Sequence, residues 1–336
     1  MTKDGRVILA HGNGGRLMRE LIDEIFACHL ANPSLDVTLD AAPLGLSSDD
    51  ALVMSTDGFV VKPLEFPGGT IGSLAVNGTV NDLAVSGARP DVLTLSAIIE
   101  EGLEIAQLDR IAASLGKAAK TACVRVIAGD TKVVPRGEGG GLYLVTAGVG
   151  SIGQGVDLGM SHIRPGDTLV ISGPIGDHGV AVLLAREDFE ISGDVFSDCA
   201  PVTGLTVAAL EVPGLRFMRD PTRGGLATVA HEIASKTGFD VTLDEAALPV
   251  REPVSMVCEM LGYDPLFLAG EGRVVAVISA EHVDRLVEVW RDNPQGRDAA
   301  IVGQVGAGTG RVALRTRLGG SRVIDELVDD PLPRIC

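Results

Sequence analysis

The sequence predicts an α/β protein with mixed layers of helices and strands, arranged as two domains and a short tail. Strand-like apolar segments alternate with helical patterns along the chain, and this alternation runs twice. A glycine-rich stretch, 151–166, separates the two runs. With 336 residues the chain is also long enough for two domains that each bury a core. We therefore expect one domain over 1–152, a second over 153–328 and a flexible tail over 329–336.

The first run opens with a glycine-rich turn, His11 to Gly15, that leads into a helical pattern. Such a turn exposes backbone N–H groups and can hold an anion, although many N-terminal turns look the same. The strands expected after it cover 51–57, 94–99, 124–128 and 142–149, and the expected helices cover 68–84 and 103–120.

Polar side chains mark this run at strand ends and inside one helix. Asp57 closes the first expected strand, and Asp130 follows the third, two residues before Lys132. A carboxylate at a strand end is commonly a turn residue, but it is also where α/β proteins place ligand groups. Asn81 and Asp82 lie in an otherwise apolar helix, so they either face water or belong to a site.

The second run contains a helix start that suits phosphate. Asp220 to Gly225 places an acid, a hydroxyl, an arginine and two glycines directly before the helix expected over 226–236. An ordinary helix cap at Thr222 explains the segment equally well. The other elements expected here are strands over 167–172, 240–243 and 274–279, and helices over 180–186, 254–261 and 281–291.

Charge and motif patterns exclude several classes of protein. The formal charge of −17 argues against nucleic acid or an anionic membrane as a partner. The same charge suits a soluble, cytoplasmic protein. No segment approaches the roughly 18 apolar residues that a membrane helix needs. The pattern GxGxxG at 148–153 is not a dinucleotide site, because the residues after it are not helical. No P-loop is present in the sequence.

The five cysteines are widely spaced and contain no CxxC pair, so neither a disulfide framework nor a structural zinc site is indicated. Cys28, Cys123 and Cys258 lie in apolar surroundings and are expected to be buried. Cys336 ends a segment with two prolines, which favour an extended arm of roughly 20 Å. Taken alone, a terminal cysteine is more simply an accident on a frayed end.

Short carboxylates recur in turns and helix starts of the predicted fold. They are Asp40, Asp57, Asp82, Asp130 and Asp220. Lys132 and Arg223 add cations in similar settings. Hard oxygen ligands together with cations are the ingredients of a site that holds Mg²⁺ and a polyphosphate. Any one of these residues alone is more simply structural, so it is the combination that predicts such a site.

Six segments carry motifs of one known kind. They are His11 to Gly15, Phe66 to Asp82, Gly129 to Val134, Gly176 to Gly179, Asp220 to Gly225 and the terminal Pro333-Arg334-Ile335-Cys336. Together they resemble the HypE family of hydrogenase maturation factors, over essentially the whole chain. The terminal Pro-Arg-Ile-Cys is the most specific part, because the other segments fit any enzyme related to aminoimidazole ribonucleotide synthetase. Gly58, Gly270 and Arg273 depart from the family pattern.

The resemblance implies two domains like aminoimidazole ribonucleotide synthetase, a homodimer formed by the N-terminal halves, and ATP with Mg²⁺ as cofactors. It implies that Cys336 receives a carbamoyl group from the carbamoyltransferase HypF, and that ATP drives the dehydration of this group to a thiocyanate. The cyanide is then expected to pass to iron on the HypC–HypD scaffold, for the active site of a nickel–iron hydrogenase.

The resemblance and this chemistry assign roles to residues of the sequence. Asp57, Asp82 and Asp220 are expected to hold Mg²⁺, with Asp40 and Asp130 as further candidates. The expected nucleotide contacts are Asp57, Asn81, Asp82, Asp130, Thr131, Lys132 and Arg223. Lys132 is also expected at the phosphate or the carbamoyl oxygen. Glu271 is the expected base, with His11 and His178 as alternatives.

Two other classes of protein stay open. A related ATP-dependent enzyme, such as a selenophosphate synthetase or aminoimidazole ribonucleotide synthetase itself, explains the aspartates but gives Cys336 no task. A non-catalytic scaffold that docks a partner through its tail explains Cys336 but leaves the aspartates unused.

Overall fold

The computed structural model describes residues 5–12, 16–35, 44, 51–186, 194–327 and 335. Asp40, Cys336 and the rest of the tail except Ile335 lie outside the described residues. The described part divides into two compact units. The N-terminal unit contains the residues up to Leu83 together with Ala88–Gln154, and the C-terminal unit contains Ala84–Gly87 and Gly155–Ile335.

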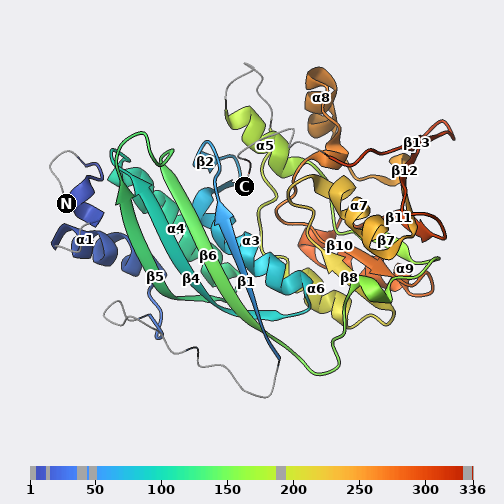
Figure 1. Cartoon of the computed structure of the whole chain (residues 1–336), viewed down its shortest axis with the longest axis horizontal. Helices are drawn as coiled ribbons and strands as arrows, with labels where there is room; N and C mark the ends of the chain where they lie inside the picture. Colours follow the sequence, from blue (N-terminus) through green and yellow to red (C-terminus); the bar gives the residue numbers. More distant parts are fainter. Residues whose placement is uncertain are drawn as a thin grey trace. The chain divides into compact units, whose positions relative to one another are not determined.

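A four-stranded sheet forms the N-terminal unit, in the order β1-β6-β4-β5 (Figure 1). Only the pair β4–β5 is parallel. The strands are β1 (Ala51–Phe59), β6 (Leu142–Ile152), β4 (Arg89–Glu100) and β5 (Arg125–Val134), and β2 (Glu65–Phe66) pairs with β3 (Gly69–Thr70). Helices α3 (Ile71–Val85) and α4 (Ile105–Thr121) cover one face, which we call the inner face. The side chain of Thr146 in β6 points to this inner face, because its Oγ1 donates to the carbonyl of Ala75 in α3 at 3.0 Å.

Two glycines let the inner layer pack closely. A Cβ on Gly72 of α3 would lie 2.4 Å from the carbonyl oxygen of Ile111 in α4. One on Gly116 of α4 would lie 2.3 Å from the carbonyl oxygen of His29. The second contact docks the N-terminal helix, which consists of α1 (Arg16–Leu21), a π-helical segment (Ile22–Ala27) and α2 (Cys28–Leu30). The helix predicted after the glycine-rich turn is therefore confirmed.

Strands β1 and β5 run further than the sequence predicted. Asp57 pairs with Thr146, and Asp130 pairs with Ser96 of β4, so both acids lie inside strands rather than at strand ends. Pairing with a neighbouring strand outweighs the low β propensity of aspartate. The two acids also lie on opposite faces. Asp57 shares the inner face with Thr146, whereas Ser96 pairs with Val145, whose side chain points to the outer face.

The prediction of buried cysteines is wrong at two positions. Cys28 and Cys123 are exposed, whereas Cys258 is buried. Cys123 follows α4 with a φ of 57°, so its apolar neighbours in sequence do not carry it into the core. Burial raises the pKa of the Cys258 thiol to about 11, with Asp264 adding to the effect.

A seven-stranded sheet forms the C-terminal unit, in the order β13-β12-β9-β11-β7-β10-β8. The pair β12–β9 is parallel and the other pairs are antiparallel. The strands are β7 (Thr168–Ile171), β8 (Leu215–Arg219), β9 (Asp240–Asp244), β10 (Val275–Ile278), β11 (Ala300–Gly306), β12 (Val312–Arg315) and β13 (Ser321–Val323). The helices are α5 (Asp177–Ala185), α6 (Thr203–Leu210), α7 (Gly225–Thr237), α8 (Glu252–Leu261) and α9 (Val283–Arg291). Single 3-10 turns occur at Leu9–Gly12 of the N-terminal unit and at Met160–His162, Glu245–Ala247, Pro265–Phe267 and Pro294–Gly296 of this one.

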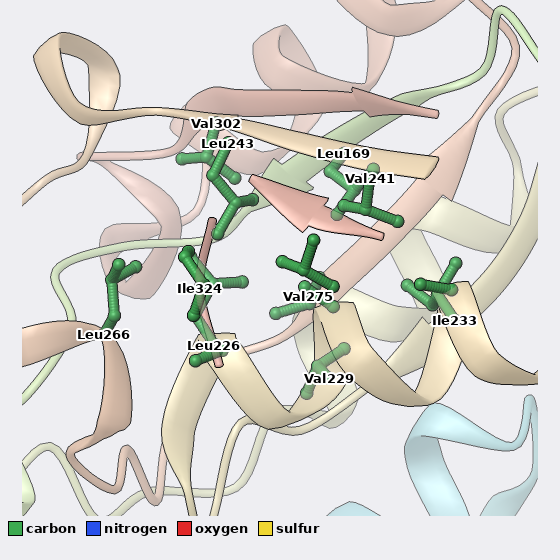
Figure 2. Close-up of a cluster of buried hydrophobic side chains, with 14 of the residues drawn as sticks. Leu169, Leu226, Val229, Ile233, Val241, Leu243, Leu266, Val275, Val302 and Ile324 are labelled. Atoms are coloured by element: carbon green, nitrogen blue, oxygen red, sulfur yellow. The ribbon is translucent and has the colours of Figure 1, made fainter. Parts of the chain in front are cut away.

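Apolar side chains project from both faces of this sheet. Leu169 and Val275 point into a cluster that α7 covers (Figure 2). Their neighbours Val170 and Ala276 point the other way, into a second cluster around Trp290 of α9. Burial of these two clusters on either side of one sheet holds the unit together and fixes the loops at its edges.

The mixed layers of helices and strands predicted from the sequence are confirmed. Helix α5 begins at Asp177 rather than at Val180, because Gly176 turns the chain into the helix with a φ of 82°. At α7 the N-cap is Gly224, with a φ of 75° and no side-chain cap, so capping by Thr222 is wrong. Within the described ranges, no helix is long and apolar enough to cross a membrane.

Candidate functional site

Asp57 and Asp82 lie together on the inner face of the N-terminal sheet. The hydroxyl of Ser55 donates to Oδ2 of Asp82 at 2.7 Å, which ties α3 to β1. Asp57 follows two residues later on the same face of β1, about 7 Å along the strand. Gly78 allows this approach, because a Cβ there would lie 2.7 Å from the ring of Phe59 in β1. Two carboxylates and a hydroxyl, all hard oxygen ligands, are thus gathered in one place.

Asn81 is buried, so the first of the two explanations offered from the sequence, that it faces water, is wrong. Its exposed fraction is 1%, and that of Asn77, one helical turn earlier on the same side of α3, is 3%. Two buried amides in an apolar helix are typical of a polar site, because polar groups are buried only with partners. Asp82 beside them is half-buried.

Asp130 and Lys132 lie on the outer face, at the opposite edge of the sheet. The Nζ of Lys132 is 3.0 Å from Oδ2 of Asp130, and both side chains are more than half exposed. Three strand spacings, about 14 Å, and the sheet itself separate this pair from Asp57. Within one chain the structure therefore does not bring Lys132 to Asp57 and Asp82. Thr131, between the pair in sequence, is buried on the inner face.

A cavity of about 180 Å³ lies between the N-terminal helix and β5. Its walls are mainly apolar, with Ile22 and Phe26 from the helix and Leu95 from the sheet. Asp130 and Thr131 line its polar edge. A pocket with this lining suits a largely apolar part of a ligand that also makes one or two polar contacts.

Glu271 is buried in the C-terminal unit, in the loop before β10, with 2% of its surface exposed. Its backbone N–H donates to Oδ1 of Asp198 at 3.0 Å. The following Gly272 has no room for a side chain, because a Cβ would lie 1.9 Å from the carbonyl oxygen of Asp198. The loop that carries Glu271 is therefore fixed in position by Asp198 and its backbone.

The segment predicted to bind phosphate lies beside this loop. The N–H of Gly270 donates to the carbonyl of Pro221 at 2.9 Å. Asp220 is buried, whereas Arg223 is exposed. The structure thus brings Asp220 and the Glu271 loop into one region of the C-terminal unit.

Arg273 joins two buried carboxylates to the same loop. Its Nε lies 3.2 Å from Oδ2 of Asp198, and its Nη2 lies 3.4 Å from Oδ2 of Asp177. The Nε also donates to the carbonyl of Pro174 at 3.0 Å. Burial, with the nearby charge of Asp198, raises the pKa of Asp177 to about 6, although Arg251 and Arg273 oppose this rise. The two carboxylates are therefore held close together mainly by one guanidinium group.

Asp177→Asn is expected to flatten the pH dependence of stability in mildly acidic solution. In the wild type the folded state keeps a proton on Asp177 that the unfolded state has already released, so the free energy of unfolding falls as the pH rises from about 4 to about 6. A shift of about two units corresponds to about 3 kcal/mol, and asparagine removes this contribution.

Urea unfolding at several pH values measures this effect. Asp284→Asn, which removes an exposed acid from α9, is the matched control and is expected to keep the wild-type slope. An unchanged slope in Asp177→Asn would contradict the raised pKa.

The two histidines considered as bases are both held in place. His11 is buried, and its Nδ1 lies 3.0 Å from a backbone nitrogen three residues earlier, as in a turn. In His178, Nδ1 lies 2.8 Å from Oγ of Ser197, and Nε2 lies 2.8 Å from the carbonyl oxygen of Ile335. Both ring nitrogens of His178 are engaged, so neither is available as a base in this conformation.

Several polar residues of these clusters were not predicted as site residues. They are Ser55, Asp177, Ser197 and Asp198. In the sequence Asp177 belongs to the segment Gly176 to Gly179, and no motif includes Asp198. Among these four, only Asp177 could have been recognised from the sequence, because it is a charged residue at the start of a helix that is otherwise apolar.

Asp57 and Asp82 are the described pair best suited to a divalent cation. No three histidine, cysteine, aspartate or glutamate side chains among the described residues come together as a metal site. Asp220 belongs to the other unit, and Asp40 lies outside the described residues. Mg²⁺ usually binds one or two carboxylates and fills its other positions with phosphate oxygens and water. The two acids and the hydroxyl of Ser55 fit that pattern.

Comparison with known families matches both halves of the chain. Residues 39–152 match the N-terminal domain, and residues 164–315 the C-terminal domain, of AIR synthase related proteins. Carbamoyl dehydratase HypE of Azotobacter vinelandii is 48% identical over 336 residues, which cover 99% of this chain and 98% of that protein. The chain belongs to the HypE family. The resemblance drawn from the six sequence motifs is confirmed.

Solved structures of HypE proteins have the same fold. A HypE in complex with ATP superposes with a TM-score of 0.93 at 43% identity, over 98% of this chain and 99% of that one. The structure of a HypE–HypF complex gives a TM-score of 0.80 at 41% identity, over 91% of this chain and 99% of that one. The prediction of two domains like AIR synthase is therefore confirmed.

Proposed function

We propose that this chain uses ATP to dehydrate a carbamoyl group carried on Cys336, which converts an S-carboxamide to a thiocyanate. The cyanide of that group then supplies the active site of a nickel–iron hydrogenase. One geometric observation supports this proposal beyond membership of the HypE family. Ile335, the residue before Cys336, is buried in the C-terminal unit and hydrogen-bonded to His178. His178 follows Asp177, which Arg273 joins to Asp198 and the Glu271 loop, so Ile335 lies beside that loop.

The chemistry requires a phosphoryl transfer and a base. An amide oxygen is a poor leaving group, so the γ-phosphoryl group of ATP is first transferred to the carbamoyl oxygen. The C–O bond then breaks, the oxygen leaves in inorganic phosphate, and the C–N bond becomes a nitrile. Two N–H protons must also be removed, and we assign this step to the carboxylate of Glu271. Its loop is fixed by Asp198, which keeps such a base in position.

ATP and Mg²⁺ are the cofactors of this reaction. We assign Mg²⁺ to Asp57 and Asp82, where it supplies charge neutralisation for the phosphates. Asn81 and Thr131 are the buried polar groups closest in sequence to the acids of the N-terminal unit, and we assign them to the nucleotide. Arg223, exposed at the start of α7, is assigned to phosphate.

We also propose that two copies pair through the outer face of the N-terminal sheet. Leu52, Met54 and Val145 are 49%, 69% and 37% exposed on this face. Apolar side chains gathered on one exposed face mark a protein interface. Lys132 cannot reach Asp57 in its own chain, so we assign its contact with phosphate or the carbamoyl oxygen to the nucleotide of the second copy. Sedimentation equilibrium measures the mass in solution, and a monomer at micromolar concentration would refute the pairing.

The partners follow from the same proposal. We assign the role of carbamoyl donor to HypF, because a HypE that is 41% identical to this chain has been solved in complex with HypF. The HypC–HypD iron scaffold is the proposed acceptor of the cyanide. Because the chain has a formal charge of −17, nucleic acid and anionic membranes are poor partners for it. We place the reaction in the cytoplasm.

Intact-protein mass spectrometry tests the function as a whole. The chain is incubated with HypF, carbamoyl phosphate and Mg-ATP, and it is then isolated and incubated with or without fresh Mg-ATP. The proposal predicts a carbamoyl adduct that loses the mass of one water only when ATP is added. A chain that stays unmodified while ATP is consumed would instead be a related small-molecule synthetase. A chain that neither binds ATP nor becomes modified would be a docking scaffold.

Asp82→Asn and Asp57→Asn are expected to weaken Mg-ATP binding by roughly 10- to 100-fold each, because each removes a charged oxygen ligand. Isothermal titration calorimetry measures the affinity. Asp109→Asn, on α4 with a side chain that is 49% exposed, is the matched control and is expected to bind like the wild type. If both site variants bind Mg-ATP with wild-type affinity, the magnesium site does not include these two aspartates.

A further inference from the structure

His178 is a buried histidine that links three separate segments of the C-terminal unit. It lies in the first turn of α5 and has no exposed surface. One ring nitrogen contacts Ser197, in the segment that leads to α6, and the other contacts Ile335, the residue before the terminal cysteine. Ile335 is itself 2% exposed. Both hydrogen bonds are needed for stability, because a buried ring nitrogen without a partner would lower the free energy of unfolding.

The partners fix which ring nitrogen carries the proton. A carbonyl oxygen can only accept, so Nε2 donates to Ile335. Nδ1 then accepts from the hydroxyl of Ser197, whose oxygen in turn accepts the backbone N–H of Cys199 at 3.1 Å. Burial lowers the pKa of His178, although its bond to Ile335 opposes this, so the ring stays neutral in this tautomer. The resulting chain of hydrogen bonds runs in one direction, from Cys199 to the tail.

The start of α5 is fastened to the loop that carries the proposed base. The N–H of Gly179 donates to the carbonyl of Ala269 at 3.2 Å, two residues before Glu271. A Cβ on Gly179 would lie 3.1 Å from the Cβ of Leu268, so only a glycine fits this approach comfortably. His178 and the Glu271 loop are therefore parts of one rigid frame.

We propose that His178 is a positioning residue that holds the tail by the last peptide bond of the chain. The carbonyl that its N–H binds belongs to the bond between Ile335 and Cys336. This inference rests on the proposed function, in which Cys336, the residue after the held carbonyl, carries the carbamoyl group. A single neutral hydrogen bond and one isoleucine side chain also make a contact that can be released for partners.

Digestion with a carboxypeptidase of broad specificity tests the contact directly, because the bond that the enzyme cuts first contains the carbonyl held by His178. The loss of Cys336 is followed by intact-protein mass spectrometry. His178→Leu keeps an apolar side chain of similar size but leaves the carbonyl without a donor, and we expect Cys336 to be removed roughly 10- to 100-fold faster. His178→Gln restores an N–H donor, and we expect it to return the rate to within about threefold of the wild type.

His162→Leu is the matched control, because it makes the same change at a partly exposed histidine of the same unit. It is expected to leave the rate unchanged. Folding of each variant is checked in the same samples by alkylation of Cys258, which is 2% exposed and reacts only if the unit opens.

Two results would overturn the proposal. In one, Cys336 is removed equally fast from the wild type and from folded His178→Leu. In the other, the wild type is cut as fast as a free peptide with the same last six residues. Either result would remove the geometric support for the proposed function without refuting it, because that function fails only if the wild-type tail never carries a carbamoyl group that ATP dehydrates.

Discussion

Cys336→Ala is expected to abolish both carbamoyl uptake and ATP-dependent dehydration, because it removes the sulfur that carries the group. ATP binding is expected to remain, since the proposed nucleotide contacts lie elsewhere in the chain. Intact-protein mass spectrometry after incubation with HypF, carbamoyl phosphate and Mg-ATP gives the first result, and calorimetry with Mg-ATP gives the second.

Cys199→Ala is the matched control for this prediction. Cys199 is partly exposed in the C-terminal unit and lies near the tail contact through Ser197, but its thiol has no role in the proposal. It is expected to carry and dehydrate the carbamoyl group like the wild type. A full carbamoyl adduct on Cys336→Ala would show that another residue is the carrier.

Glu271→Gln is expected to stop the reaction after carbamoyl uptake. Glutamine keeps the shape of the side chain but cannot take a proton, and loss of a positioned base typically slows such a step by roughly 10²- to 10⁴-fold. The backbone bond from residue 271 to Asp198 does not depend on the side chain, so the loop is expected to keep its place. The S-carboxamide should therefore accumulate on Cys336, which single-turnover mass spectrometry measures.

Glu259→Gln changes an exposed glutamate on α8 and is expected to react at the wild-type rate. Dehydration by Glu271→Gln within about twofold of the wild type would assign the base to another group. In that case the pH dependence of the single-turnover rate would identify its pKa.

Much of this fold could be predicted from the sequence because periodicity and glycine turns act locally. The helix predicted over 226–236 appears as Gly225–Thr237, and the one over 103–120 appears as Ile105–Thr121. In both, apolar residues at helical spacing lie between clear start and stop signals. The terminal Pro-Arg-Ile-Cys identified the family for a different reason, since that segment is specific to it.

The arrangement of the sites could not be predicted in the same way, because it depends on which strands pair. Asp57 and Asp130 look alike in the sequence, each an acid after an apolar segment. Strand order places them at opposite edges of one sheet, and the pairing register places them on opposite faces. No local pattern reports strand order, so the sequence grouped two acids that the fold separates.

The buried cluster around Glu271 depended on tertiary contacts even more strongly. Asp177, Asp198 and Arg273 come from three segments that only the folded chain brings together. Each residue alone resembles an ordinary polar loop residue, and its burial is visible only in the structure. The same is true of Ile335, whose contact with His178 joins positions 157 residues apart.

The fate of the carbamoyl oxygen tests the central claim most directly. The chain is charged on Cys336 with a carbamoyl group that contains oxygen-18, isolated, and mixed with unlabelled Mg-ATP. If ATP drives dehydration by phosphoryl transfer to that oxygen, the label is expected in inorganic phosphate, in step with the loss of water mass from the protein. Label that stays on the protein while ATP is hydrolysed, or that appears in solvent water, would contradict the account.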